Sequence, residues 1–201
     1  MKSLSSTVVI GMLFLFSSCK KAVEAVIDHG SNTTPANTWI EYTIQKGQHY
    51  ADQNGVQLVQ YNEQKFTVRF DSSAIYQTVD SSNQEDINKL YGFSDNNADH
   101  ELYSARFGWN WARNALRLYA YIYNNGVRSS QEITSIAIGP QYECSIKVSA
   151  DQYIFSANNV TIVMPRSSTT PEGEGYKLYP YFGGDETAPH EIEIWIEEVS
   201  D

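Results

Sequence analysis

Cysteine is nearly absent from this chain of 201 residues, which contains only Cys19 and Cys144. Two cysteines do not build a disulfide framework. In the segment ECSIKVS, Cys144 alternates with Ile146 and Val148, so we expect a buried apolar side chain and not a nucleophile. About 165 residues remain for one domain, which is enough to bury roughly 70% of the unfolded surface without a disulfide or metal.

Basic residues are also scarce. The chain has 14 Lys and Arg against 24 Asp and Glu, which gives a formal net charge of −10. Nucleic acid and anionic membrane surfaces repel such a protein, so neither is an expected partner. Strongly anionic polymers are disfavoured for the same reason, unless a local basic face overrides the overall charge. A Gly-rich nucleotide-binding loop and an internal repeat are missing as well.

Long apolar runs are missing apart from residues 7–16, which follow Lys2. This run is too short to span a bilayer as a mature helix, and it is typical of a signal peptide. The chain then reaches Phe16-Ser17-Ser18-Cys19, which resembles a bacterial lipoprotein signal in the loose form common in Bacteroidetes. The resemblance implies removal of residues 1–18 and lipidation of Cys19; an ordinary secretory signal is the alternative.

We therefore divide the chain into a signal peptide (1–18), a lipidated tether (19–37) and a folded domain (38–201). Cleavage would change the net charge to −11, because it removes one lysine and no acid. Lys20 and Lys21 follow Cys19, where surface-exported lipoproteins carry acidic residues. This favours the periplasmic face of the outer membrane.

The folded domain is predicted to be all-β. Short alternating segments separated by turn residues indicate an antiparallel β-sandwich with almost no helix. Ala150-Asp151 and Asn158-Asn159 are predicted tight turns. Beyond the hairpin described next, we expect strands at residues 39–44, 56–61, 65–71, 131–138, 143–148, 153–157, 160–164, 176–182 and 191–199, and a short helix at 84–90.

Residues 104–123 are predicted to form a hairpin with a tight turn at Arg113-Asn114. This turn places Ala112 opposite Ala115 and brings all the apolar residues to one face, as a buried core requires. The expected cross-strand pairs are Trp111 with Leu116, Trp109 with Leu118, and Phe107 with Ala120.

The opposite face of this hairpin is rich in tyrosine and arginine. Tyrosine rings stack on sugars, Arg and Asn reach hydroxyls or carboxylates, and Gly108 lets a ligand approach the backbone. The alternative is a set of cross-strand tyrosine pairs that only stabilise a half-exposed sheet. The predicted ligand-binding residues are Arg106, Asn110, Arg117, Tyr119, Tyr121 and Tyr123.

An acidic and amide-rich loop, residues 94–99, supplies the oxygen ligands that calcium prefers. Asp95 and Asp99 are the candidate ligands, and an ordinary Asx turn is the alternative. No other cofactor is required by the sequence. His49, His100 and His190 are scattered and lack the spacing of a metal site.

Three passages resemble the concanavalin-like jelly rolls, including laminin-G-like domains. They are ALRLYAYIYNNG (115–126), ECSIKVSADQYIFSANNVTIVMPR (143–166) and KLYPYFGGDETAPHEIEIWIEEV (177–199). The chain also resembles uncharacterised Bacteroidetes lipoproteins of this size. The jelly-roll resemblance implies a sheet face that binds glycans, calcium at a rim, and relatives that are glycoside hydrolases or polysaccharide lyases.

Neither enzyme class is matched well. Hydrolases of this fold carry Glu-x-Asp-x-Glu on one strand, and the nearest match is Glu191, Glu193 and Glu197, which a solvated strand face explains equally. A lyase needs a base, an acid and a group that neutralises a carboxylate. Candidates are Arg106 or Arg117 as neutraliser, Tyr119 or Tyr121 as acid or base, and His100.

The sequence therefore favours a lipid-anchored envelope protein that binds an oligosaccharide or polysaccharide without cleaving it. A polysaccharide lyase on the same face is the second hypothesis. The third is a protein-docking lipoprotein, in which Trp195 on the outer face of the last strand anchors a partner.

Overall fold

The computed structural model describes residues 38–199, so the predicted signal peptide, the tether and Cys19 lie outside the described residues. The regular secondary structure of residues 38–199 is almost entirely β, as predicted, with two short 3₁₀ helices, η1 (Ser72–Ala74) and η2 (Ser81–Glu85). The strands are β1 (Ile40–Ile44), β2 (Leu58–Tyr61), β3 (Glu63–Phe70), β4 (Asn88–Ser94), β5 (Tyr103–Ala112), β6 (Ala115–Asn124), β7 (Val127–Ile136), β8 (Gln141–Val148), β9 (Gln152–Ala157), β10 (Val160–Pro165), β11 (Gly173–Leu178) and β12 (Ile192–Val199).

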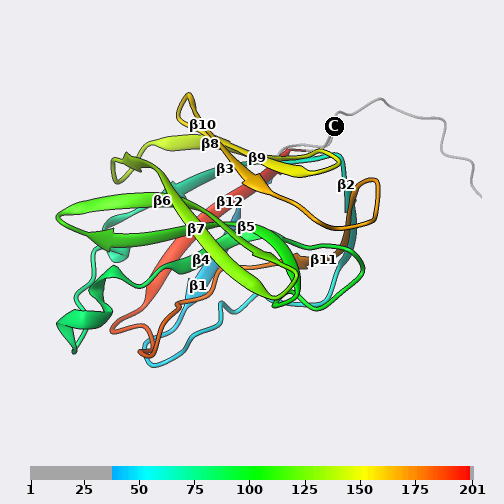
Figure 1. Ribbon diagram of the computed structural model, residues 1–201. Coiled ribbons are helices and arrows are strands. Elements are labelled where there is room, and N and C mark those ends of the chain that lie inside the picture. Colours follow the sequence, from blue (N-terminus) through cyan, green and yellow to red (C-terminus); the bar gives the residue numbers. More distant parts are fainter. Residues whose placement is uncertain (1–37, 200–201) are drawn as a thin grey trace, which may run out of the picture. The chain divides into compact units, whose positions relative to one another are not determined.

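The strands form two antiparallel sheets of six strands each, which Figure 1 shows as two layers. One sheet has the order β1-β12-β3-β8-β9-β10 and is called the β12 sheet. The other has the order β2-β11-β4-β5-β6-β7 and is called the β5 sheet. The predicted antiparallel β-sandwich is confirmed. No helix among residues 38–199 has the length and hydropathy needed to cross a bilayer.

Aromatic side chains from both sheets fill the core between the layers. Phe66 of β3 meets Phe107 of β5 with ring centres 5.4 Å apart, and Phe70 meets Trp109 at 5.3 Å. Tilted and edge-to-face contacts of this kind add to the free energy gained by burying the rings. Cys144 is buried in the same core, as predicted, and burial raises the pKa of its thiol.

The predicted register of the β5–β6 hairpin is confirmed. Trp111 pairs with Leu116, Trp109 with Leu118, and Phe107 with Ala120. The turn residues Arg113 and Asn114 have φ values of 53° and 57°, as a two-residue hairpin turn with right-handed twist requires. The alternation of side chains therefore places one face of the hairpin in the core and the other on the outer face of the β5 sheet.

The region before this hairpin differs from the prediction. The helix expected at residues 84–90 is wrong, because a 3₁₀ helix ends at Glu85 and strand β4 begins at Asn88. A register shift between Lys89 and Gly92 interrupts the alternation in β4, which explains why its sequence did not indicate a strand. The strand expected at 176–182 already ends at Leu178, two residues before Pro180, which has no N–H to donate.

Candidate functional site

A pocket of about 830 Å³ lies on the outer face of the β5 sheet. Its floor comes from strands β4, β5, β6, β7 and β11, and its walls come from the segments around residues 50–56, 99–101 and 179–185. The aromatic and basic side chains that line it include Tyr50, Lys89, His100, Arg106, Tyr121, Tyr123, Arg128, Tyr176 and Tyr181.

Arg106, Lys89 and Tyr121 form the floor of the pocket. The guanidinium carbon of Arg106 lies 5.5 Å from the centre of the Tyr121 ring, and Nζ of Lys89 lies 4.7 Å from the same centre. Lys89 donates one hydrogen bond, of 2.6 Å, to the backbone oxygen of Ile87. Arg106 is only 8% exposed, and its buried Nε has no hydrogen-bond partner.

Within residues 38–199, the charges at this floor lack ion-pair partners, and only the more distant Asp86 and Glu101 partly offset Lys89 and Arg106. Among residues 38–199, neither Lys89, Arg106 nor Arg128 forms an ion pair. Burial, and then repulsion by Arg106 and Arg128, lowers the pKa of Lys89 to about 8, and burial also lowers the pKa of Arg106. The acids of the pocket, Asp99, Glu101 and Asp185, come from loops at its rim and not from the strands of its floor.

His100 and Tyr176 lie together on one wall. The backbone N–H of His100 donates to the Tyr176 hydroxyl at 3.1 Å, and Nδ1 of His100 lies 3.0 Å from the same oxygen. Burial, and then the charge of Arg106, lowers the pKa of His100 below its ordinary value of 6.5. The imidazole is therefore neutral at pH 7 and able to accept a proton or a hydrogen bond.

Two aromatic side chains, Tyr50 and Tyr181, line another part of the pocket, and His49 stacks on Tyr181. The rings of His49 and Tyr181 are stacked, with centres 5.2 Å apart and planes 9° apart. Tyr50 meets Tyr181 edge to face at 4.9 Å, and 65% of Tyr50 is exposed. Tyr50 thus presents a large aromatic surface at the mouth of the pocket.

The other half of the predicted ligand face is covered by the chain before β4. Asn110 is completely buried and donates to the backbone oxygen of Glu85 at 3.1 Å, and the Tyr119 hydroxyl donates to Asn110 at 3.1 Å. A Cβ atom at Gly108 would lie 2.4 Å from Cγ2 of Ile87, so glycine is needed there for close packing and not for ligand approach. Asn110 and Tyr119 are therefore corrected from ligand residues to packing residues.

Arg117 also lies outside the pocket. Its Nη1 forms an ion pair with Glu132 at 2.7 Å, and its Nε donates to the backbone oxygen of Ala112. Of the six residues predicted to bind a ligand, the structure brings together Arg106, Tyr121 and Tyr123 in the pocket. The pocket thus occupies part of the face that the sequence pattern selected, and the chain before β4 covers another part of it.

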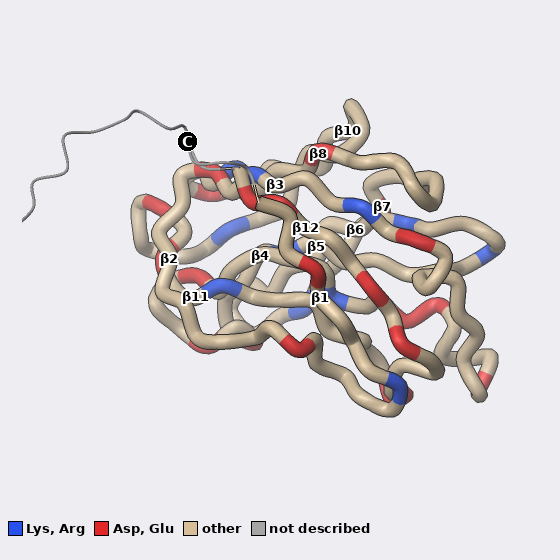
Figure 2. The backbone as a smooth tube through the Cα atoms, turned by 180° about the vertical axis from the view of Figure 1, so that it is seen from behind, with Lys and Arg blue, Asp and Glu red and all other residues tan. Residues whose placement is uncertain are grey.

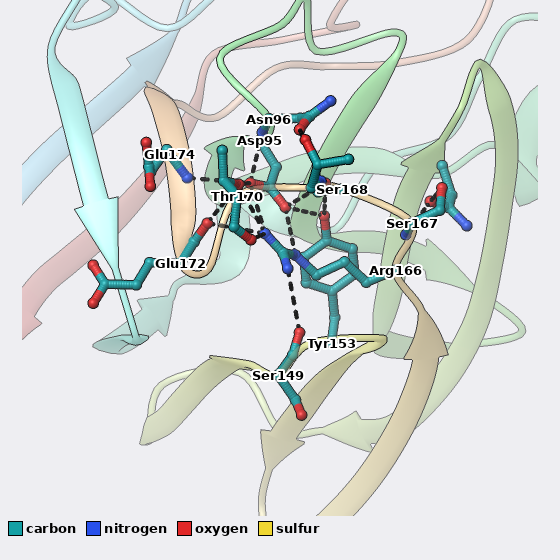
Figure 3. Close-up of polar contacts among 12 residues, drawn as sticks. Asp95, Asn96, Ser149, Tyr153, Arg166, Ser167, Ser168, Thr170, Glu172 and Glu174 are labelled. Carbon is teal, nitrogen blue, oxygen red and sulfur yellow. Dashed lines mark hydrogen bonds and ion pairs between the residues drawn. The ribbon is translucent and has the colours of Figure 1, made fainter.

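The predicted calcium ligand Asp95 has a different role. Figure 3 shows its carboxylate at the centre of a buried cluster, where Nε of Arg166 donates at 2.8 Å and the hydroxyls of Ser168 and Tyr153 donate at 2.7 and 2.5 Å. Burial works to raise the pKa of Asp95, but these donors outweigh it and hold the pKa low. These bonds already engage the carboxylate oxygens of Asp95, so the structure does not favour Asp95 as a calcium ligand.

Asp99 does not make a metal site by itself. It lies at the pocket rim, with Oδ1 3.8 Å from Nδ1 of His100. Within residues 38–199, no group of three or more His, Cys, Asp or Glu side chains is placed to hold a metal ion. His190 is engaged elsewhere, since its Nε2 lies 2.8 Å from the backbone oxygen of Ser73.

Glu193 and Glu197 of the last strand are not among the residues that line the pocket. Glu193 and Glu197 belong to β12, which lies in the other sheet (Figures 1 and 2). This arrangement does not support their pairing as hydrolytic acids on the pocket face. Trp195 of the same strand is half-buried, with the Arg69 guanidinium 4.3 Å from its ring centre and its Nε1 donating to Glu41.

Sequence reasoning missed several residues of the pocket, including Lys89, Arg128, Tyr50 and Tyr181. Lys89 precedes the irregularity of β4, and Arg128 belongs to the polar start of β7, which the prediction began only at residue 131. Tyr50 and Tyr181 form an isolated bridge between two segments that are far apart in the sequence. Only the clustering of tyrosines in YPYFGG was a usable signal.

No protein-family model matches the sequence, and it is similar to none of the curated proteins. Its structure is similar to that of alginate lyase vAL-1 from Chlorella virus, with 11% identity, a TM-score of 0.50, and 84% of this chain and 86% of that chain covered.

Two glucanase structures are also similar. One is a family 16 endo-glucanase from Bacteroides ovatus, with 11% identity, a TM-score of 0.51 and 81% of each chain covered. The other is an endo-1,3-beta-glucanase (laminarinase) from Thermotoga petrophila, with 10% identity, a TM-score of 0.53, and 80% of this chain and 75% of that chain covered. At these identities the similarities establish the fold, a concanavalin-like jelly roll, as the sequence resemblance implied.

Proposed function

We propose that this protein is a lipid-anchored component of a bacterial cell envelope, at the periplasmic face of the outer membrane, and that it binds a glycan without cleaving it. The binding site of the proposal is the pocket on the β5 sheet. Lipidation at Cys19 and the envelope location rest on the N-terminal sequence. The proposal of a glycan as the partner rests on the composition of the pocket.

The composition of the pocket is the observation that carries this proposal. Six of its lining residues are tyrosines, and one of them, Tyr50, is largely exposed at the mouth. Tyrosine rings offer flat apolar faces to the C–H groups of sugars, while their hydroxyls exchange hydrogen bonds with sugar hydroxyls. An open pocket that combines such rings with a few convergent charged groups is a typical binding site for small polar ligands. The solved structures of similar fold, which include an alginate lyase and glucanases, support a glycan as the ligand.

A panel of immobilised polysaccharides tests the proposal. The protein would be residues 19–201 with Cys19→Ser, which prevents lipidation, and its matched control would carry Tyr50→Ala and Tyr181→Ala. We expect at least one polysaccharide to retain the unaltered protein more strongly than the control. Retention is expected to be unchanged by a chelator, because Asp95 is engaged by Arg166. Equal behaviour of the two folded proteins on every polysaccharide would contradict the proposal.

A polysaccharide lyase remains the second candidate, favoured by the contact between His100 and Tyr176 beside Arg106. In β-elimination a base removes the proton next to a sugar carboxylate, the glycosidic C–O bond breaks, and an acid protonates the leaving oxygen. The neutral His100 is suited to removing the proton, and the Tyr176 hydroxyl is suited to protonating the leaving oxygen. Ultraviolet absorbance of unsaturated products in the same panel distinguishes cleavage from binding, and we expect none.

The lipid anchor has its own test. A bacterial host that processes lipoproteins would be grown with a palmitate analogue that can be detected on labelled proteins. The full chain is expected to take up the label, and Cys19→Ser is expected to abolish it. Secretion of a cleaved protein without label would instead support an ordinary secretory signal.

A further inference from the structure

We propose that Arg106 and Lys89 form an anion subsite in the floor of the pocket, and that the glycan of the proposed function carries a carboxylate or sulfate group that binds there. This inference rests on the proposed function and specifies its ligand: an acidic sugar and not a neutral one.

The first argument is the state of Arg106. Its side chain is 8% exposed, its Nε is buried without a hydrogen-bond partner among residues 38–199, and its guanidinium makes a cation–π contact with the Tyr121 ring. Buried cations in proteins are normally paired, because removal of a charge from water costs several kcal/mol. The other buried arginine, Arg166, follows this rule through its ion pair with Asp95. Arg106 lacks such a partner within residues 38–199, and it faces an open pocket.

The second argument is that the cations are gathered together. Lys89 lies over the same Tyr121 ring as Arg106, and the exposed Arg128 lines the pocket beside them. Like charges at close range repel each other, and Arg106 and Arg128 add to the effect of burial in lowering the pKa of Lys89. This arrangement is costly in the free protein and becomes favourable when an anion lies between the charges.

Three other basic residues of the β5 sheet and its β5–β6 turn are paired with acids. Lys177 also lines the pocket, but its Nζ is ion-paired with Glu198, and Arg113 and Arg117 are paired with Glu85 and Glu132. Lys89, Arg106 and Arg128 thus lie together in the pocket without an ion pair, in a protein whose net charge is strongly negative. The other cations of residues 38–199 without an ion pair, Lys46, Arg69 and Lys147, do not line the pocket. A local field of this kind selects an anionic group, while the guanidinium fork of Arg106 fits two oxygens of a carboxylate or sulfate.

Equilibrium binding to matched pairs of polysaccharides tests the inference. Polygalacturonate, alginate and hyaluronate would each be compared with the same polymer after its carboxylates are reduced to alcohols, and dextran sulfate would be compared with dextran. We expect at least one acidic polymer to bind about 10-fold or more tightly than its neutral form, since hydrogen bonds to charged groups contribute about 1.5–3 kcal/mol. The comparison with the carboxylate polymers tests recognition of a carboxylate, and the comparison with dextran sulfate tests recognition of a sulfate.

Substitutions then locate the binding. Arg106→Gln and Lys89→Gln are each expected to weaken binding of the acidic polymer about 10-fold, with little effect on any residual binding of the neutral form. Arg113→Gln is the matched control, because Arg113 is exposed, is paired with Glu85 and lies outside the pocket. Equal loss in all three variants would indicate non-specific attraction and would overturn the subsite.

Failure of the anion subsite can be distinguished from failure of the glycan-binding proposal. Equal binding of acidic and neutral polymers, sensitive to Tyr50→Ala, would overturn the anion subsite and leave the glycan-binding proposal intact. Absence of binding to every polymer would overturn both.

Discussion

The guanidinium carbon of Arg106 lies 5.5 Å from the centre of the Tyr121 ring, at the floor of a pocket in which no acid of residues 38–199 forms an ion pair with Arg106. A cation over an aromatic face gains about 0.5–2 kcal/mol. This gain is smaller than the several kcal/mol that removal of a charge from water costs. The pair is therefore a source of instability in the free protein.

Replacement of Arg106 by an apolar residue is expected to stabilise the free protein. Arg106→Met keeps the length of the side chain and removes the buried charge, so we expect the free energy of unfolding to rise by about 1 kcal/mol or more. Urea unfolding monitored by tryptophan fluorescence measures this change. The same variant should lose binding to an acidic glycan. A variant that is clearly less stable than the unaltered protein would contradict the view that the charge is uncompensated.

The titration of the Lys89 amine is expected to make glycan affinity depend on pH. Its pKa in the free protein is about 8, lowered from 10.5 by burial and then by Arg106 and Arg128. An anionic ligand favours the charged amine, so affinity should be highest below pH 8 and should fall as the pH rises above it. Binding should also take up a proton near pH 8.

Calorimetric titrations at pH 7 and pH 9, in buffers of different ionisation enthalpy, measure the affinity and the proton uptake. His100 titrates below 6.5 and does not interfere in this range. Lys89→Gln is the control, and its affinity should be the same at both pH values. An equal decline in Lys89→Gln would assign the pH dependence to another group.

Substitution of Asp95 is expected to lower the stability of the protein strongly. Asp95→Asn would leave Arg166 buried without its counter-charge, which costs about 3–5 kcal/mol of unfolding free energy. The matched control is Glu85→Gln, whose ion pair with Arg113 is exposed to solvent and contributes little to stability. Chemical unfolding of both variants measures the difference. Similar small losses in both would show that the buried cluster does not depend on the charge of Asp95.

Substitution of Tyr50 by Ala is expected to weaken glycan binding with little change in stability. Tyr50→Ala removes a ring that is 65% exposed, so the unfolding free energy should change by less than about 0.5 kcal/mol. Loss of one stacking contact, about 0.5–1.5 kcal/mol, should weaken glycan binding roughly 2- to 10-fold. Tyr50→Phe should retain most of the affinity, because the ring remains. Full affinity in Tyr50→Ala would remove this residue from the site.

Local alternation was sufficient to predict the sandwich and the hairpin register. Phe107 and Trp109 alternate with polar residues, and the turn at Arg113-Asn114 fixes which residues face each other. The same reasoning failed at β4, where the register shift after Lys89 breaks the period of two. Local pattern does not reveal such irregularities, because they depend on the neighbouring strand.

The candidate site was predicted only in part. The alternation identified Arg106, Tyr121 and Tyr123, but the chain before β4 covers Asn110, and Asp95 meets Arg166 across 71 residues of sequence. Contacts of this range follow from the packing of loops onto the sheets. The sequence therefore predicts the face of the sheet, and the tertiary structure decides which part of it is accessible.

Hydrogen–deuterium exchange of the backbone, with and without the polysaccharide retained most strongly in the panel, tests the central claim most directly. If the pocket binds the glycan, exchange should slow in residues 103–124 of β5 and β6 and around residues 176–182, and should be unchanged in β12. Slower exchange confined to β1 and β12 around Trp195 would contradict the pocket and would favour a docking surface on the opposite sheet.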